Sequence, residues 1–167
     1  VELKKNFGQC PAFKAGIDYA TGDFIITMDG DLQNDPSDIP MMVAMATKGD
    51  YDLVAGIREK RKDGFILRKL PSKLANWPLR RVTKVDIKDN GCALKAFRAD
   101  MAKSIPLYGE LHRFISVLAH YEGAKIAQVN VKHHPRIHGT SKYGLSRTFR
   151  VLSDLILMLF FRKYAQK

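Results

Sequence analysis

The sequence predicts an α/β fold, because segments with helical periodicity alternate with short apolar runs along its 167 residues. Two of these runs, 23–28 and 52–57, have the length and composition of buried strands. Between them, apolar residues recur at the spacing of one helix face: Ile39, Met42, Val43 and Ala46. A hydrophobic content of 46% with 27% charged residues is typical of a globular chain.

The first third of the chain is expected to contain two helices, each followed by one of these strands. Pro11 suits the first turn of a helix that Gly22 ends. The first apolar run comes next. Asp35 can then cap a second helix, with Pro36 at its first position and Gly49 at its end.

The rest of the chain continues the alternation. Residues 65–83 have helical spacing that Pro71 and Pro78 interrupt, which predicts a broken or kinked helix. The other expected elements are a strand at 92–97, a helix at 112–121, a strand with Ala127, Val129 and Val131 on one face, and a helix from Leu145.

Positive charge is concentrated in one segment of a chain whose net charge is +11. Between Arg58 and Lys84 there are ten Lys and Arg residues and two acidic residues. Such a bias indicates an anionic partner, which can be nucleic acid, a phosphorylated substrate or an acidic membrane surface. The alternative is a basic helix that is simply solvated.

Two cysteines and the hydropathy pattern narrow the possible classes of protein further. Cys10 and Cys92 match neither a CxxC motif nor the spacing of metal ligands, so both are predicted to be reduced core residues of a cytosolic domain. The sequence has no run of 18 apolar residues, so no segment is expected to span a bilayer by itself.

The stretch ITMDGDLQNDPSD carries four carboxylates directly after the first predicted strand. Asp29 and Asp31 follow the strand's carboxyl end, where open α/β sheets bind ligands. Carboxylates this close repel each other unless a proton or a cation lies between them, and oxygen ligands suit Mg²⁺ or Mn²⁺. The alternative is a helix-capping turn, which accounts for Asp35 and Asp38 better than for Asp29 and Asp31.

Seven short motifs follow one another along nearly the whole chain. They are N-x-G at Asn6, A-T-G-D at Ala20, D-G-D-L-Q at Asp29, V-A-G-I-R at Val54, D-N-G-C-A-L-K-A-F-R at Asp89, H-R-F-I at His112 and H-P-R-I-H-G-T-S-K-Y at His134. In this order and spacing they resemble glycosyltransferase family 2, and within it the polyprenyl-phosphate branch related to dolichol-phosphate mannose synthase. The combination is far more specific than any one motif.

The resemblance implies a GT-A-type fold, a Rossmann-like mixed sheet flanked by helices. It also implies that Asp29, Asp31 and Gln33 hold a divalent metal ion and the diphosphate of the donor. Further substrate-binding residues implied by the resemblance are Arg58, Arg113, Arg136, Ser141 and Lys142. The implied catalytic residues are Asp31, Asp89 and Arg136, and the family often treats Asp89 as a base candidate. An acceptor phosphate is already largely dianionic at neutral pH, so we instead expect Asp89 to orient groups or to pair with the metal or acceptor-site cations. The alternative for Asp89 is a simple turn beside Asn90 and Gly91.

The reaction that this resemblance implies is an inverting transfer of a hexose, mannose or glucose, from GDP-mannose or UDP-glucose to a dolichyl or undecaprenyl phosphate. The family normally starts with a strand and a loop that recognise the nucleotide base, and Asn6 follows that region. Residues 1–144 are therefore expected to form a partial catalytic domain of a longer enzyme, on the cytoplasmic face of a membrane.

Residues 134–167 are expected to contact phosphates and lipid. The loop at 134–144, which combines basic residues with Gly139 and Gly144, suits a mobile lid over phosphates, although it can also be an ordinary exposed loop. Residues 145–167 combine the apolar run LILMLFF with Arg162 and Lys163, which predicts an amphipathic helix at an anionic membrane surface. The alternative for this helix is a core or oligomer contact.

Two other functions fit parts of the sequence. A metal-dependent nucleotidyltransferase also uses carboxylates at a strand end, and it would release pyrophosphate instead of nucleoside diphosphate. A basic nucleic-acid-binding domain fits the charge alone, since the sequence lacks a recognisable nucleic-acid-binding motif, so no nucleic-acid partner is expected. The histidines at 112, 120, 133 and 134 lack metal-ligand spacing with the acidic residues.

Overall fold

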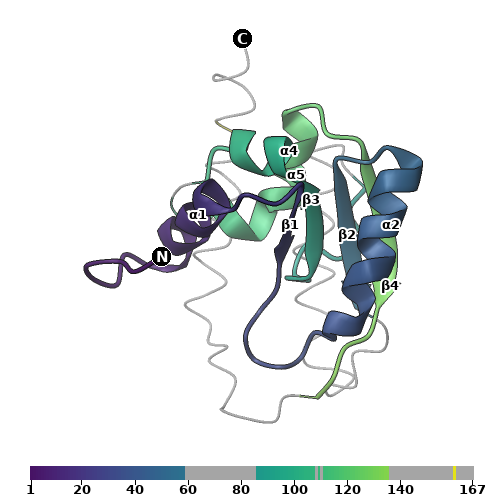
Figure 1. Ribbon diagram of the computed structural model, residues 1–167, viewed down its shortest axis with the longest axis horizontal. Helices are drawn as coiled ribbons and strands as arrows, with labels where there is room; N and C mark the ends of the chain where they lie inside the picture. Colours follow the sequence, from purple (N-terminus) through teal and green to yellow (C-terminus); the bar gives the residue numbers. More distant parts are fainter. Residues whose placement is uncertain (59–85, 108, 110, 136–159, 161–167) are drawn as a thin grey trace. The chain divides into compact units, whose positions relative to one another are not determined.

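The computed structural model describes residues 1–58, 86–107, 109, 111–135 and 160 (Figure 1). All of the helices and strands given below belong to one compact unit, formed by residues 1–63 and 87–137. A second unit comprises residues 64–86 and 138–167, of which only Asp86 and Phe160 are described. The helices predicted at 65–83 and from Leu145 therefore lie outside the described residues.

A mixed sheet of four strands forms the centre of the described unit. The strands are β1 Phe24–Thr27, β2 Leu53–Arg58, β3 Lys95–Arg98 and β4 Ile126–Val131, in the spatial order β1-β3-β2-β4. β3 is antiparallel to both β1 and β2, whereas β2 and β4 are parallel. The predicted mixed sheet flanked by helices is confirmed.

This topology brings four chain segments to one edge of the sheet. The carboxyl ends of β1, β2 and β4 lie at the same edge as the amino end of β3, because β3 alone runs the other way. Thr27 pairs with Lys95, which is also opposite Ala55, and Ala55 in turn pairs with Gln128. Residues that follow β1, β2 and β4, or precede β3, can therefore form one site.

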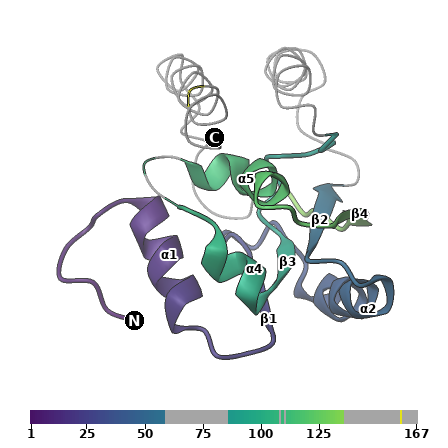
Figure 2. The same cartoon turned by 90° about the horizontal axis from the view of Figure 1, so that it is seen from above.

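Helices cover both faces of the sheet (Figures 1 and 2). α2, Ile39–Gly49, packs on β2 and β3, while α4, Ala99–Ser104, and α5, Ile115–Tyr121, contact the strands from the opposite side. α1, Gln9–Tyr19, packs against α4. Two short 3₁₀ turns complete the described elements: η1 Pro36–Asp38 and η2 Leu111–Phe114.

The core on the α2 side of the sheet is small-residue-rich and fully apolar. Its buried members are Met42, Ala46, Val54, Cys92, Leu94, Ala96, Ala127 and Val131. Cys10 and Cys92 are both buried, which confirms the prediction that they are core residues. The predicted apolar face of β4 is also confirmed, because Val129 packs on the same cluster as Ala127 and Val131.

Several element boundaries differ from the sequence-based expectation. The helix expected from Asp35 starts as the 3₁₀ turn η1, and regular α-helix begins only at Ile39. The strand expected at 92–97 begins at Lys95, because the residues before it form a loop. α4 has no counterpart among the expected elements: it lasts six residues, and its N-cap residue, Arg98, makes no capping hydrogen bond from its side chain.

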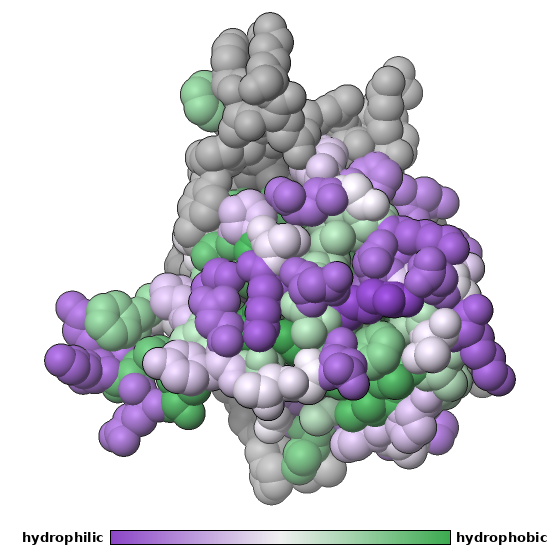
Figure 3. All heavy atoms as spheres, turned by 45° about the horizontal axis from the view of Figure 1, so that its top comes forward, coloured by the Kyte–Doolittle hydropathy of each residue, from purple (hydrophilic) through white to green (hydrophobic). Residues whose placement is uncertain are grey.

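Hydrophilic side chains cover most of the described surface in the view of Figure 3, with apolar residues between them. The large exposed apolar side chains include Phe7, Tyr19, Met28 and Leu32. Within the described residues, no helix is long and apolar enough to cross a membrane.

Candidate active site

The acidic turn, residues 29–34, follows β1 at the sheet edge and is shaped by its own side chains. The Asp31 carboxylate accepts a hydrogen bond from the Gln33 backbone N–H, at 3.2 Å from Oδ1 to N. Leu32, between them, has a φ of 62°, a left-handed conformation that is uncommon for a residue with a branched side chain. An Asp that bonds the backbone two residues on favours such a turn.

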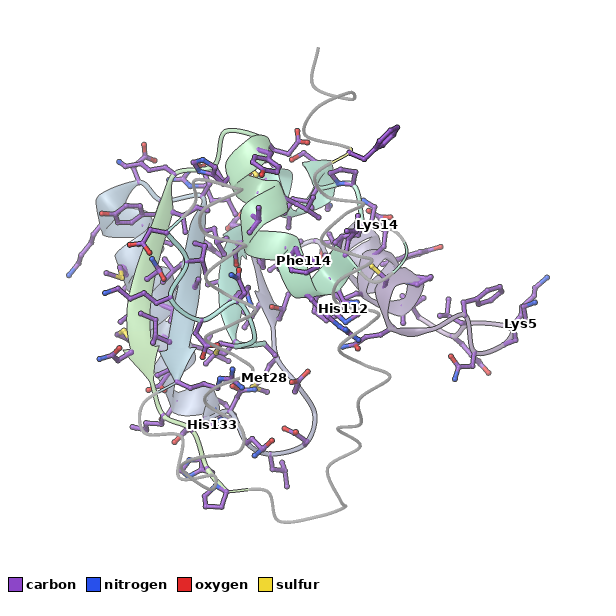
Figure 4. The ribbon with its side chains drawn as sticks, turned by 180° about the vertical axis from the view of Figure 1, so that it is seen from behind. Lys5, Lys14, Met28, His112, Phe114 and His133 are labelled. Carbon is purple, nitrogen blue, oxygen red and sulfur yellow. The ribbon has the colours of Figure 1, made fainter. Side chains whose placement is uncertain are left out.

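A second chain segment holds the acidic turn in place. The backbone N–H of His134 donates to the Gln33 carbonyl at 2.8 Å, and the Gln33 side-chain amide donates to the His134 carbonyl at 3.3 Å. Asn34 and His133 form an isolated antiparallel bridge. Met28 and His133 accordingly lie at the same end of the molecule in Figure 4. The turn is thus fixed to the residues that follow β4.

Asp35 and Asp38 both have structural partners, but the capping interpretation holds only for Asp35, because the Asp38 side chain makes no capping hydrogen bond. Asp35 caps η1 by accepting from the Ser37 N–H at 2.9 Å, and His134 Nε2 lies 3.2 Å from its other oxygen. The bonds from Ser37, and then from His134, lower the pKa of Asp35 to about 2. The buried Asp38 accepts a 2.7 Å hydrogen bond from the Lys132 N–H.

Asp29 is used differently from these two acids. Its side chain is exposed, and among the described residues it takes part in neither a hydrogen bond nor an ion pair. It borders a shallow hollow of about 230 Å³. The hollow is lined by Met28, Asp29, Gly30, Leu32, Asn34, Asp35, Pro36 and His134. Because the Asp29 carboxylate has no hydrogen-bond partner among the described residues, it is available to a ligand.

The clamped loop, residues 88–94, lies at the same edge and carries the predicted site residue Asp89. The guanidinium of Arg58 donates to both Asp89 oxygens, from Nε and from Nη2, each at 2.7 Å. Only 13% of the Arg58 side chain and 17% of the Asp89 side chain are exposed. Two predicted substrate-binding or catalytic residues are therefore joined in one bidentate, largely buried ion pair.

Glycines allow the close approach of the clamped loop to β2. A Cβ atom at Gly56 would lie 2.8 Å from the Leu94 carbonyl oxygen and 3.0 Å from Cys92 Sγ. A Cβ atom at Gly91 would lie 2.9 Å from Nη2 of Arg58. The glycines of the V-A-G-I-R and D-N-G-C motifs thus have a packing reason: each makes room for the Arg58–Asp89 pair or for the loop that carries it.

Sequence reasoning missed Lys95, the first residue of β3, which is only 3% exposed. Its Nζ donates to the Cys92 carbonyl. Burial lowers the pKa of Lys95, against the opposing influence of Cys92 and of the carboxylates Asp89 and Asp29. The only signal in the sequence was a single lysine inside the apolar run A-L-K-A-F. In a strand whose side chains alternate between two faces, a lysine is normally assigned to the solvent-facing side.

Of the remaining predicted site residues, the structure describes only Arg113. Arg113 lies on η2, which packs against α1, and two of its guanidinium nitrogens are shielded from solvent. Its neighbour His112 lies beside α1 in Figure 4. Arg136, Ser141 and Lys142 lie outside the described residues.

A divalent ion fits the acidic turn only if substrate supplies part of its coordination shell. Within the described ranges, no three His, Cys, Asp or Glu side chains are close enough together to hold a metal ion. Asp29 is free of hydrogen bonds there, and Asp31 lies two residues away at the same strand end. Two carboxylates completed by phosphates and water are the donor set that Mg²⁺ typically uses. Gln33, the third predicted ligand, bonds His134 through its amide nitrogen.

Solved structures identify the fold as that of GT-A glycosyltransferases. The glucosyl-3-phosphoglycerate synthase of Mycobacterium tuberculosis, solved with Mn²⁺ and UDP-glucose, superposes with a TM-score of 0.70 at 17% sequence identity. The match covers 94% of this chain and 56% of that one. The predicted fold class is confirmed by this likeness, which at such low identity concerns the fold alone.

The chain belongs to glycosyl transferase family 2, because the model of that family matches residues 1–105. The dodecaprenyl-phosphate galacturonate synthase of Rhizobium johnstonii is 52% identical over 98% of this chain. The undecaprenyl-phosphate 4-deoxy-4-formamido-L-arabinose transferase of Edwardsiella ictaluri is 39% identical over 95% of it. The chain spans about half the length of these curated relatives, 49% and 48% respectively.

Proposed function

We propose that the protein to which this chain belongs transfers a sugar from a nucleotide-diphosphate donor to a polyprenyl phosphate. The names of the two relatives support this acceptor class. The structural observation that carries the proposal is Asp29, an exposed carboxylate at the carboxyl end of β1 with no hydrogen-bond partner among the described residues. An unsatisfied carboxylate at this point of an α/β sheet suits a metal–diphosphate ligand.

In this proposal Asp29 and Asp31 hold a divalent ion, Mg²⁺ or Mn²⁺, against the diphosphate of the donor. The bound ion would neutralise charge that develops on the departing diphosphate. Asp31 contributes one oxygen while its Oδ1 also accepts from the Gln33 N–H, so the turn presents the carboxylate in a fixed orientation. Gln33 remains a predicted ligand, through its side-chain oxygen or through its hold on His134.

The bond that forms joins an oxygen of the acceptor phosphate to the anomeric carbon, and the bond that breaks joins that carbon to the diphosphate. A phosphate monoester has a second pKa of about 6, so the acceptor is largely dianionic at neutral pH and needs little help from a general base. Asp89 accordingly acts as an orienting group. Its bidentate contact with Arg58 supports that role, because both carboxylate oxygens are already hydrogen-bonded.

The identity of the transferred sugar is a more specific part of the proposal. Mannose and glucose, from GDP-mannose or UDP-glucose, are the sequence-based expectation. The relative that is 52% identical is named for galacturonate, which supports a uronic acid over a neutral hexose. Arg58, Arg113, Arg136, Ser141 and Lys142 are proposed to contact substrate phosphates, and residues 145–167 are proposed to dock the protein peripherally on an anionic membrane.

Product analysis with the full-length protein tests the proposal. UDP-galacturonate, UDP-glucose and GDP-mannose are each incubated with polyprenyl phosphate, and lipid-linked sugar and free nucleotide are measured. The proposal predicts equal amounts of lipid-linked sugar and nucleoside diphosphate from one donor. Release of pyrophosphate, or no lipid-linked product from any donor while the protein is folded, would contradict it.

A further inference from the structure

A row of polar side chains crosses the sheet directly below the candidate active site. Thr27, Lys95, Ala55 and Gln128 are register partners on β1, β3, β2 and β4, so their side chains share one face of the sheet. The next residues in register, Ala96 and Val54, point into the apolar core under α2. The row is therefore on the opposite face, where Thr27 is 6% and Lys95 3% exposed.

Every polar member of this row bonds the backbone of the clamped loop. Thr27 Oγ1 donates to the Ala93 carbonyl at 2.7 Å, and Lys95 Nζ donates to the Cys92 carbonyl. Gln128 Oε1 accepts from the Lys88 N–H at 2.7 Å. Three strands thus hold the two ends of the loop that carries Asp89. Because β1 also leads into the acidic turn, one set of contacts fixes the two acidic segments relative to each other.

Lys95 is the member of the row whose presence is hardest to explain by stability. An amino group removed from water loses favourable solvation, most of all when it is protonated, and a single carbonyl acceptor restores only part of it. Within the described residues, Cys92 provides its one hydrogen-bond acceptor, while Asp89 and Asp29 attract its charge and Arg58 repels it. A methionine of similar length would fill the same space without that cost.

We propose that Lys95 is a positioning residue that holds the clamped loop, and through it the Arg58–Asp89 pair, in register with the metal-binding end of β1. This inference rests on the sugar transfer proposed above. Lys95 does not touch substrate in this account; it acts through the Cys92 carbonyl. Its removal should slow transfer in the bound complex more than it weakens donor binding, because the acidic turn has its own support from His134.

The kinetic test replaces Lys95 by Met in the full-length protein. We expect kcat to fall about 10- to 100-fold with donor KM changed less than about 3-fold, since small displacements of positioning groups cost rates of this order. The melting temperature should stay the same or rise. Lys125→Met is the matched control, because Lys125 Nζ also donates to a carbonyl, that of Gly49 at 2.9 Å, but at the opposite end of β4. That variant should retain wild-type kcat.

Two measurements separate this inference from the proposed function. Amide hydrogen exchange of residues 88–94 should accelerate in Lys95→Met and not in Lys125→Met, whether or not any sugar is transferred. In a double-mutant cycle, Lys95→Met should lower kcat much less in the Asp89→Asn variant than it does in the wild type. Unchanged exchange of the loop, additive effects, or a loss of activity that only follows a loss of stability would each overturn the positioning role. Absence of transfer by the wild type would instead overturn the proposed function.

Discussion

The acidic turn and the clamped loop occupy the same edge of the sheet and use their carboxylates in opposite ways. In the clamped loop both oxygens of Asp89 bind Arg58, and side chains from three strands hold the backbone. In the acidic turn the contacts with residues 133 and 134 come from the backbone and from the Gln33 side chain, and Asp29 stays exposed. The difference indicates which acid organises the site and which one is left for a ligand.

The largest difference between the two regions should appear when each acid is removed. Asp89→Ala takes away both contacts to a mostly buried guanidinium, so we expect the free energy of unfolding to fall by about 2–4 kcal/mol. Asp29→Ala should change it by less than about 0.5 kcal/mol, as is usual for an exposed side chain without partners. Urea unfolding of both variants measures this contrast. Equal losses would remove the distinction between the two regions.

A methyl group placed against the clamped loop should destabilise the protein more than one placed in the acidic turn, although this contrast is smaller than that between the two acids. Gly56→Ala would place Cβ 2.8 Å from the Leu94 carbonyl oxygen, so the clamped loop must shift, at a cost of about 1–3 kcal/mol. Gly30→Ala, in the acidic turn, meets no heavy atom within 4 Å and should be close to neutral. Thermal unfolding of the two alanine variants compares them directly. A neutral Gly56→Ala would show that the loop is less tightly packed than described.

The smallest expected effect is a change in protein stability with pH that arises from Asp35, next to the acidic turn. The folded protein lowers the pKa of this group from 3.8 to about 2, so its contribution to stability is fully present above 3.8 and is lost as the pH falls towards 2. Asp35→Asn cannot titrate, and the stability difference between the variant and the wild type should therefore shrink over that interval. Chemical unfolding at several pH values measures it; a difference that does not vary with pH would contradict the assignment.

The sequence predicted the elements that depend on local periodicity and chemistry. The strand ending before Asp29, the cap at Asp35 and the apolar face of β4 all follow from residue type and spacing, and the structure contains them. Those signals also located the acidic turn at a strand end.

Long-range order could not be predicted in the same way. The strand order depends on which surfaces pack together, and the Arg58–Asp89 pair joins residues 31 positions apart in the sequence. Lys95 was missed because a lysine in an alternating strand normally faces solvent, and its burial depends on long-range packing that includes its contact with the clamped loop. α4 was missed because six residues without a capping side chain give almost no helical signal.

The central claim is that the acidic turn binds a divalent ion together with the diphosphate of the donor. Calorimetry of UDP and GDP binding to the full-length protein, with Mg²⁺ or Mn²⁺ and with chelator, tests it most directly. We predict that one nucleotide binds the wild type at least about 10-fold more weakly without the ion, and that Asp31→Asn abolishes this metal dependence while the melting temperature without metal stays unchanged. Nucleotide binding that is equally tight with and without a divalent ion, and unaffected by Asp31→Asn, would contradict the account.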